Sequence, residues 1–174
     1  DVEVLVANNA YALQRETIEG IPVTRIPQMG RVASAPITLG YPKWLRKLGA
    51  SAHILHFHFP NPTAEASYLF SGLEGRVVVT YHSDIVRQRY LKRLYHPVMV
   101  RFLGAAHAII VTSPRYVESS PVLADFREKC IVIPLGIDLE RFRLTAEQAG
   151  KVAGIRAREG ERLILFIGRF RYYK

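Results

Sequence analysis

Short, continuous apolar runs recur along the chain and alternate with segments of helical character. The runs are unbroken rather than alternating apolar and polar, which is typical of strands buried on both faces of a parallel sheet. The expected strands are 2–6, 23–26, 54–58, 77–81, 108–112, 131–133 and 163–167. The expected helices are 42–48, 63–71, 85–103 with a break at Pro97, 119–126 and 145–159. This alternation predicts βαβ units and an open, doubly wound α/β sheet with helices on both faces.

Local signals refine the pattern near the start of the chain. Glu19 and Gly20 mark a turn before the second strand. Residues 28–40 carry few large apolar side chains and are expected to form a mobile loop. The segment 7–10, which follows the first expected strand, contains no glycine, and neither GxGxxG nor GxxxxGK[ST] occurs anywhere. The sequence therefore gives no support for a dinucleotide fingerprint or a P-loop.

A domain boundary is expected near residues 142–145. Thr145, with Gln148 three positions later, has the signature of a capping box at the start of a helix. The chain is thus expected to divide into residues 1–144 and 145–174.

Composition narrows the class of protein. A chain of 174 residues with 49% hydrophobic side chains suits a globular domain with a substantial core. The single cysteine, Cys130, leaves no internal disulfide and fits a reducing, cytoplasmic setting. The net charge of +9 favours anionic partners such as phosphates, acidic lipid or nucleic acid, without choosing among them.

Polar side chains lie at the ends of two expected strands. His56 and His58 share a face of their strand, and Asn61 beyond them is placed to cap the next helix. His82 and Asp84 come directly after the following strand. Open α/β sheets bind ligands at the carboxyl ends of their strands. We therefore expect His58 and His82 to lie at one edge of a parallel sheet, together with Thr112 from the next strand.

These residues admit more than one role. Each histidine either contacts a ligand or is held by the local backbone, and Asp84 either faces a ligand or caps the following helix. A zinc site made of His56, His58 and His82, with His53 as a further ligand, is a third interpretation. No Asp or Glu accompanies the histidine pair and no HExxH motif occurs, so the sequence gives this interpretation little support.

The helix expected over 85–103 is basic and amphipathic. Its apolar stripe and the flanking basic side chains are Leu91, Leu94, Tyr95 and Val98, with Arg89, Lys92, Arg93 and His96. Two explanations stay open. The helix packs on the sheet with a solvated basic face, or it contacts an anionic membrane surface. The cluster of basic and apolar residues at 43–48 adds to the second explanation.

The chain closes on an apolar run followed by Gly168, Arg169 and, five residues after that arginine, Lys174. Two cations just past a strand end suit a diphosphate group. The alternative is a strand followed by ordinary solvated charges.

Five segments in this order resemble one family. They are HFHFPNP (56–62), VVVTYHSD (77–84), AIIVTSPRYVESSPVL (108–123), IVIPLGIDLERF (131–142) and LILFIGRFRYYK (163–174). They are similar to the family-four (group-one) retaining glycosyltransferases of the GT-B fold. The resemblance implies a Rossmann-like, acceptor-side N-terminal domain over 1–144, with its first strand missing. It also implies the linker helix and first strand of the nucleotide-sugar domain over 145–174.

The resemblance also implies roles for single residues. His82 would be catalytic, close to the transferred sugar, and would stabilise or position that sugar rather than attack it. Arg169 and Lys174 would bind the diphosphate of the donor. The residues expected to line the acceptor and sugar cleft are His58, Asn61, Ser83, Asp84 and Gly136.

The function implied is that of a fragment of a retaining glycosyltransferase at the cytoplasmic face of a membrane, and the fragment alone is expected to be inactive. Its donor would be GDP-mannose or a UDP-sugar, its acceptor a glycan or a lipid-linked glycan, and no metal or other cofactor is expected. Two alternatives stay open: a non-catalytic, basic Rossmann-like module that binds acidic lipid or nucleic acid, and a metal-dependent hydrolase. Nucleic acid is the less expected partner, because Phe57, Phe59 and Tyr81 lie at strand ends rather than along a basic groove.

Overall fold

The structure, a computed structural model, describes residues 1–32, 35–85, 89–160 and 162–168. The chain falls into two compact units, Asp1–Pro134 and Leu135–Lys174, and each is described by itself. The first unit ends ahead of the boundary expected at 142–145, and that boundary stays a prediction.

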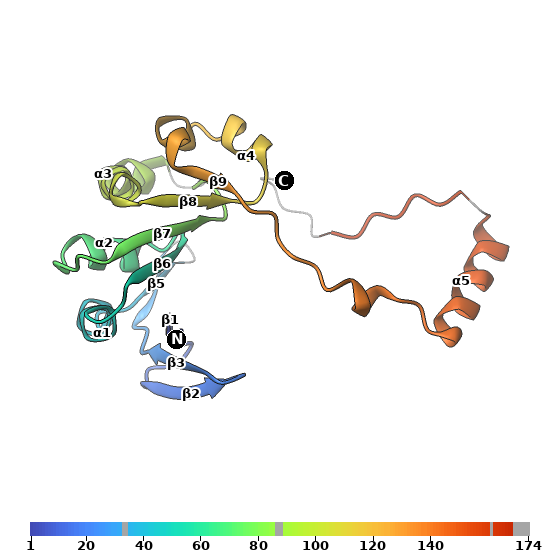
Figure 1. Ribbon diagram of the computed structural model, residues 1–174, viewed down its shortest axis with the longest axis horizontal. Coiled ribbons are helices and arrows are strands. Elements are labelled where there is room, and N and C mark those ends of the chain that lie inside the picture. Colours follow the sequence, from blue (N-terminus) through green and yellow to red (C-terminus); the bar gives the residue numbers. More distant parts are fainter. Residues whose placement is uncertain (33–34, 86–88, 161, 169–174) are drawn as a thin grey trace. The chain divides into compact units, whose positions relative to one another are not determined.

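A four-stranded parallel sheet forms the centre of the first unit (Figure 1). In spatial order its strands are β6 (Ile54–Phe59), β7 (Arg76–Tyr81), β8 (Ala108–Val111) and β9 (Cys130–Val132). Each strand is parallel to its neighbour, so a crossover must connect each pair. The predicted α/β class, with a parallel sheet flanked by helices, is confirmed.

Helices form these crossovers. They are α2 (Pro62–Leu69), α3 (Arg89–Ala105), α4 (Pro114–Ser119) and the 3₁₀ helix η1 (Leu123–Lys129). The single helix expected over 119–126 is wrong, because α4 ends at Ser119 and η1 begins beyond Pro121. A residue before proline avoids helical backbone, and Ser120 is accordingly extended, with φ −84° and ψ 115°.

Helix α3 runs through Pro97 without the break expected there. A proline inside a helix costs about 3 kcal/mol, so packing on either side of it must offset that cost. Met99 and Phe102 are buried, and Tyr95 is half-buried. The expected apolar stripe is wrong at Leu94, which is 77% exposed, because the buried face follows the positions of Tyr95, Met99 and Phe102.

One face of the parallel sheet packs against α2 and α3. The strand register aligns Phe57 with Val79 and Val79 with Ile109, so these buried side chains point the same way. Phe57 meets Tyr68 of α2 and Phe102 of α3 edge to face, with ring centres 5.5 and 5.1 Å apart. Such pairs stabilise a fold by about 1 kcal/mol in addition to the free energy that comes from burying their apolar area. The alternate residues of β6 point to the opposite face, where the candidate site lies.

A second sheet lies in the N-terminal part of the first unit. Its spatial order is β1 (Val4–Ala7), β3 (Ile21–Ile26) and β2 (Gln14–Ile18). β1 is parallel to β3, whereas β2 and β3 form a hairpin whose turn residues Glu19 and Gly20 have φ of 50° and 80°. Positive φ at both central positions is typical of the tight hairpin turn, and the predicted turn is confirmed. Strand β2 carries no apolar signal, because its sequence, QRETI, is polar and mostly exposed.

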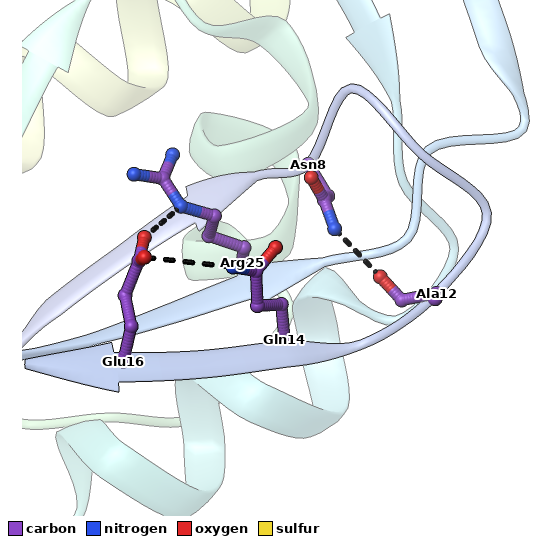
Figure 2. A network of polar contacts seen from close by, with 5 residues as sticks. All are labelled: Asn8, Ala12, Gln14, Glu16 and Arg25. Atoms are coloured by element: carbon purple, nitrogen blue, oxygen red, sulfur yellow. Dashed lines mark hydrogen bonds and ion pairs between the residues drawn. The ribbon is translucent and has the colours of Figure 1, made fainter.

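Polar contacts join β2 to β3 (Figure 2). The Arg25 guanidinium forms an ion pair with the Glu16 carboxylate, and Gln14 Nε2 donates to the same carboxylate at 3.4 Å. Asn8 Nδ2 donates to the Ala12 carbonyl at 2.8 Å and closes the loop between β1 and β2. The side chains of the ion pair are 33% and 31% exposed. The pair therefore contributes at most about 1 kcal/mol.

Residues 28–40 are not the loop that the sequence predicts. They contain a short antiparallel hairpin of β4 (Gly30–Val32) and β5 (Ala35–Ile37). Thr63 Oγ1 of α2 donates to the Pro36 carbonyl at 2.8 Å, which fixes β5 to that helix. The sequence does not indicate these strands, because a three-residue strand is too short to show a periodic pattern.

Helix α1 (Tyr41–Gly49) follows, in agreement with the helix expected over 42–48. Tyr41 Oη donates to the Leu5 carbonyl of β1 at 3.1 Å, and the Tyr41 ring belongs to the same core as Phe57. This helix therefore links the N-terminal sheet to the parallel sheet.

The second unit contains η2 (Leu139–Phe142) and α5 (Ala146–Glu159). The predicted capping box is confirmed: Thr145 Oγ1 accepts from the Gln148 N–H at 3.3 Å, and Gln148 Oε1 accepts from the Thr145 N–H at 2.8 Å. The strand expected over 163–167 is wrong, because these residues have no regular structure and are at least half exposed. A strand needs a neighbouring strand for its hydrogen bonds, and no strand in the described part of the chain pairs with this run.

Glu65, in the first turn of α2, is a buried carboxyl group. Burial raises its pKa from 4.5 to about 7, although the Asn61 N–H, which donates to Oε1, opposes part of that rise. Oε2 has no hydrogen-bond partner among the described residues. The folded protein thus keeps a proton that the unfolded chain releases. The free energy of unfolding is highest below about pH 4.5 and falls as the pH rises through about 7.

Glu65→Gln should remove this pH dependence, because the amide resembles the neutral carboxyl group and cannot ionise. We expect the variant to match the wild type near pH 5 and to exceed its free energy of unfolding by about 2–3 kcal/mol near pH 8.5. Urea denaturation across this range measures the difference, with the exposed Glu74→Gln as the control. Parallel curves for wild type and Glu65→Gln would contradict the prediction.

Candidate active site

Three polar residues lie at the carboxyl edge of the parallel sheet. His58 is the residue before the last of β6, His82 directly follows β7, and Thr112 directly follows β8. The three strands are parallel neighbours, so their carboxyl ends share one edge. The predicted placement of these residues is confirmed.

His58 and His82 are joined by a direct hydrogen bond. His58 Nδ1 lies 2.8 Å from His82 Nε2. The strand ladder produces this contact, because Phe59 pairs with Tyr81 and the His82 N–H donates to the Phe59 carbonyl at 3.1 Å. The pairing of β6 with β7 thus extends one residue past the strand end and brings the two imidazoles together.

His56 lies behind His58 on the same face of β6. The two ring centres are 5.0 Å apart and their planes lie within 22° of parallel. His56 Nε2 is 2.7 Å from Thr80 Oγ1 on the neighbouring strand. Partial desolvation lowers the pKa of both His56 and His58, and repulsion from the neighbouring imidazoles lowers it further. Both rings are therefore mainly neutral at pH 7, when each can donate one hydrogen bond and accept another.

The geometry does not fit a zinc site at these histidines. Ligating nitrogens point at the metal from about 2.0–2.1 Å. His58 Nδ1 and His82 Nε2 point instead at each other, 2.8 Å apart. His53, the further ligand considered, precedes β6 and lies at the opposite edge of the sheet. The residues that the structure describes contain no group of three or more His, Cys, Asp or Glu side chains able to hold a metal.

Asn61 closes the loop between β6 and α2. Its Oδ1 accepts from the Ala64 N–H at 3.3 Å, which confirms the predicted helix cap. Its backbone N–H donates to the buried Glu65 carboxyl group, so the side-chain oxygen and the backbone N–H of Asn61 are both hydrogen-bonded. Asn61 is half-buried at the same edge of the sheet as His58. Its role in the acceptor cleft stays a prediction.

Asp84 is the centre of a polar network beyond β7. Its Oδ1 accepts from Tyr81 Oη at 2.7 Å and from Ser120 Oγ at 2.8 Å, and its N–H donates to Tyr116 Oη at 2.8 Å. Burial, followed by the bond to Asp84, raises the pKa of Tyr81 far above its usual range. The phenol therefore stays protonated and donates. This network ties the loop after β7 to α4 and to the residue that follows it.

The remaining predicted residues are Ser83, Gly136, Arg169 and Lys174. Ser83 is half-buried between His82 and Asp84. Gly136 belongs to the second unit and is exposed. Arg169 and Lys174 lie outside the described residues. The binding roles of Ser83, Gly136, Arg169 and Lys174 stay predictions, as does the catalytic role of His82.

Thr80, Tyr116 and Ser120 are the contributors that the sequence analysis missed. Thr80 pairs with His58 across the ladder, and alignment of the two strand ends would have found it. Tyr116 and Ser120 contact Asp84 across 32 and 36 residues. No sequence pattern reports contacts of that range.

An open hollow of about 420 Å³ lies elsewhere in the first unit, between β2, β3 and α1. Arg15 and Lys47 line it and lie 4.6 and 5.0 Å from the centre of the Trp44 ring. Its wall also carries Glu3 and Glu16, and none of the predicted site residues lines it. We therefore place the candidate active site at the carboxyl edge of the parallel sheet rather than in this hollow.

A four-stranded parallel sheet flanked by helices is consistent with a Rossmann-like, N-terminal domain of the GT-B type. Residues 1–141 match the sequence profile of Glycosyltransferase Family 4. The chain belongs to this family.

Two relatives are similar over most of the chain. Over 144 residues it is 40% identical to the D-rhamnosyltransferase WbpZ of Pseudomonas aeruginosa, covering 83% of the chain and 37% of that protein. Over 147 residues it is 37% identical to the O-antigen chain mannosyltransferase C of Escherichia coli, covering 84% of the chain and 39% of that protein. The chain thus spans less than half the length of either relative.

Removing the Asp84 carboxylate should leave the buried hydroxyl groups of Tyr81 and Ser120 without their acceptor. We expect Asp84→Ala to lower the free energy of unfolding by about 2–3 kcal/mol and Tyr81→Phe by about 1 kcal/mol. The double variant should lose about 1 kcal/mol less than the two single losses combined, because both remove the same bond. Urea denaturation measures the cycle, with Ser83→Ala as the neighbouring control. Strict additivity would show that the bond contributes nothing.

Proposed function

We propose that this chain is the acceptor-side part of a retaining glycosyltransferase. The enzyme would move a hexose from a nucleotide diphosphate to a growing glycan, carried on a lipid. The observation that carries the proposal is the bonded His58–His82 pair at the carboxyl edge of a family 4 domain. Because the chain spans less than half of each relative, the activity is proposed for the full-length enzyme.

A manno-configured sugar is the donor class that we propose. The names of the two relatives give D-rhamnose for one and mannose for the other. D-rhamnose is 6-deoxy-D-mannose, so both sugars have the same configuration at C2, C3 and C4. Nothing at the carboxyl edge of the described sheet selects the nucleotide base. GDP-linked and UDP-linked donors are therefore both to be compared.

The proposed roles follow from position and charge. His82, exposed at the edge of the sheet, would contact the transferred sugar and stabilise the charge that develops on it. Arg169 and Lys174 would neutralise the departing diphosphate, which removes the need for a bound metal ion. His58, Asn61, Ser83, Asp84 and Gly136 would surround the acceptor and the sugar, partly by holding the loops that carry them.

The rival proposal of a basic, non-catalytic module for nucleic acid has less support. Stacking on bases requires exposed aromatic rings. Phe57, Phe59 and Tyr81, the aromatic residues towards the ends of β6 and β7, are 8%, 1% and 0% exposed. They belong to the core and are not available to a ligand.

The test uses the full-length enzyme with GDP-mannose, GDP-D-rhamnose and UDP-glucose as donors and a lipid-linked glycan as acceptor. Transfer from a manno-configured donor is expected, and His82→Ala should lower kcat by roughly 10²-fold, the scale of losing one preorganised donor group. His53→Ala, at the opposite edge of the sheet, is the control. A folded enzyme that transfers none of these sugars, or a His82→Ala variant with full activity, would refute the proposal.

We propose further that α3 places the enzyme on the anionic inner face of a membrane. Leu94 is 77% exposed, and Arg93, His96 and Arg101 around it are exposed as well. Arg101 lies two helical turns from Leu94, so both share one side of the helix. An exposed apolar side chain among cations suits an acidic lipid surface. No helix in the described ranges is both long and apolar enough to cross a membrane.

Replacing Arg93 and Arg101 together by Gln should weaken binding to vesicles. Each cation near an anionic surface contributes about 1 kcal/mol, so the pair should lower the partition coefficient by roughly tenfold or more. Co-sedimentation with vesicles of phosphatidylglycerol and phosphatidylcholine measures it. The matched control replaces Arg76 and Arg127, which are also exposed, and removes the same net charge. Equal losses in both double variants would show that net charge alone, and not α3, attracts the membrane.

A further inference from the structure

We infer that His58 is a positioning residue for His82. In this role, which rests on the glycosyl transfer proposed above, it fixes the plane of the His82 ring and decides which ring nitrogen faces the substrate. His58 Nδ1 lies 2.8 Å from His82 Nε2, and neither ring forms another hydrogen bond with the residues that the structure describes.

The two rings lie edge to edge and nearly in one plane. Their planes are within 10° of parallel, and their centres are 5.1 Å apart. That separation exceeds the 2.8 Å between the two nitrogens by about the width of an imidazole ring. Face-to-face rings could not combine these two distances. The arrangement is therefore that of an in-line N–H···N hydrogen bond, which fixes the rotation of both rings.

An N–H···N bond requires one nitrogen with a proton and one without. The His58–His82 contact therefore holds a single proton, and a second proton would replace the bond by repulsion between two cations. With His82 Nε2 engaged, only Nδ1 of that ring is left for a ligand. The hydrogen bond made by one imidazole nitrogen sets the protonation of the other, so His58 determines whether His82 presents a donor or an acceptor.

The neighbours of His58 hold it in place. His56 lies beside it on β6 with the ring centres 5.0 Å apart, and His56 is itself fixed to Thr80 Oγ1 of β7 at 2.7 Å. The lowered pKa of His58 agrees with a ring that stays neutral between two other imidazoles.

Other titratable groups near the pair are engaged elsewhere. The carboxylate of Asp84, which follows His82, accepts from Tyr81 and Ser120. From α4, Tyr116 Oη accepts from the Asp84 backbone rather than from either histidine. His56 is thus the titratable group in direct ring contact with His58 besides His82.

Three variants test the inference. His58→Phe keeps a flat ring beside His56 but removes the nitrogen that meets His82. His58→Asn keeps a polar group close to the position of Nδ1 and should restore the contact. His53→Phe changes an exposed histidine at the opposite edge of the sheet and is the control. Both His58 and His82 are exposed, so we expect the Tm of each variant to stay within about 3 °C of the wild type, the effect of roughly one hydrogen bond.

Two measurements are made. In the full-length enzyme, His58→Phe should lower kcat by roughly 10- to 100-fold with little change in KM, the cost of a misplaced reacting group, and His58→Asn should recover most of it. In the purified protein, long-range ¹H–¹⁵N NMR reports the protonation of each imidazole nitrogen. The His82 nitrogen signals should move towards those of the solvent-exposed His53 in His58→Phe, but not in His58→Asn.

The outcomes separate this inference from the proposed function. Unchanged His82 signals in His58→Phe, or unchanged kcat, would overturn the inference. Equal loss of kcat in His58→Phe and His58→Asn, with a fall in Tm, would show that His58 is merely structural and would overturn it too. If the wild type transfers no sugar, the proposed function fails, and the NMR result still decides whether His58 sets the state of His82.

Discussion

The ladder between β6 and β7 is the constraint on which the rest of the first unit depends. It aligns Phe57 with Val79 on the face that packs against α2 and α3. On the other face the same alignment sets His56 and His58 beside Thr80, and one further backbone bond, from His82 to Phe59, brings the second imidazole within reach. Core and candidate site therefore share one set of backbone hydrogen bonds.

The loops beside the histidines are fixed by carboxyl groups turned inward. Glu65 holds the Asn61 backbone beyond β6, and Asp84 holds Tyr81 and Ser120 beyond β7. Loops usually run over the surface with their polar groups in water. Here each loop has a polar anchor in the protein, so the folded chain itself holds the edge of the sheet in place.

The fold could be predicted largely from the sequence, because the apolar runs that become β6, β7 and β8 are long enough to show their pattern and end in polar residues. The helix cap at Asn61 and the capping box at Thr145 are also local and were predictable. Strand β2 and the β4–β5 hairpin were not, since a polar strand or a three-residue strand carries no periodic signal.

The sequence predicts which residues belong to the candidate site better than it predicts the contacts among them. Position at strand ends was enough to select His58, His82 and Asp84. The bond between the two histidines depends on register, and the contact of Asp84 with Ser120 spans 36 residues. The run over 163–167 differs, because its apolar composition is typical of a strand, but strand formation depends on a pairing partner that composition cannot report.

Successive side chains of β6 alternate strictly between two faces. Leu55, Phe57 and Phe59 lie in the core, and His56 and His58 lie on the outer face. Substitutions at the histidine positions change the polar groups at the edge of the sheet while the core packing stays as it was. The core therefore does not decide which side chains occupy these two positions. Insertion or deletion of one residue in β6 would exchange the two sets at once. The core thus tolerates point substitution at this edge but not a change in the length of the strand.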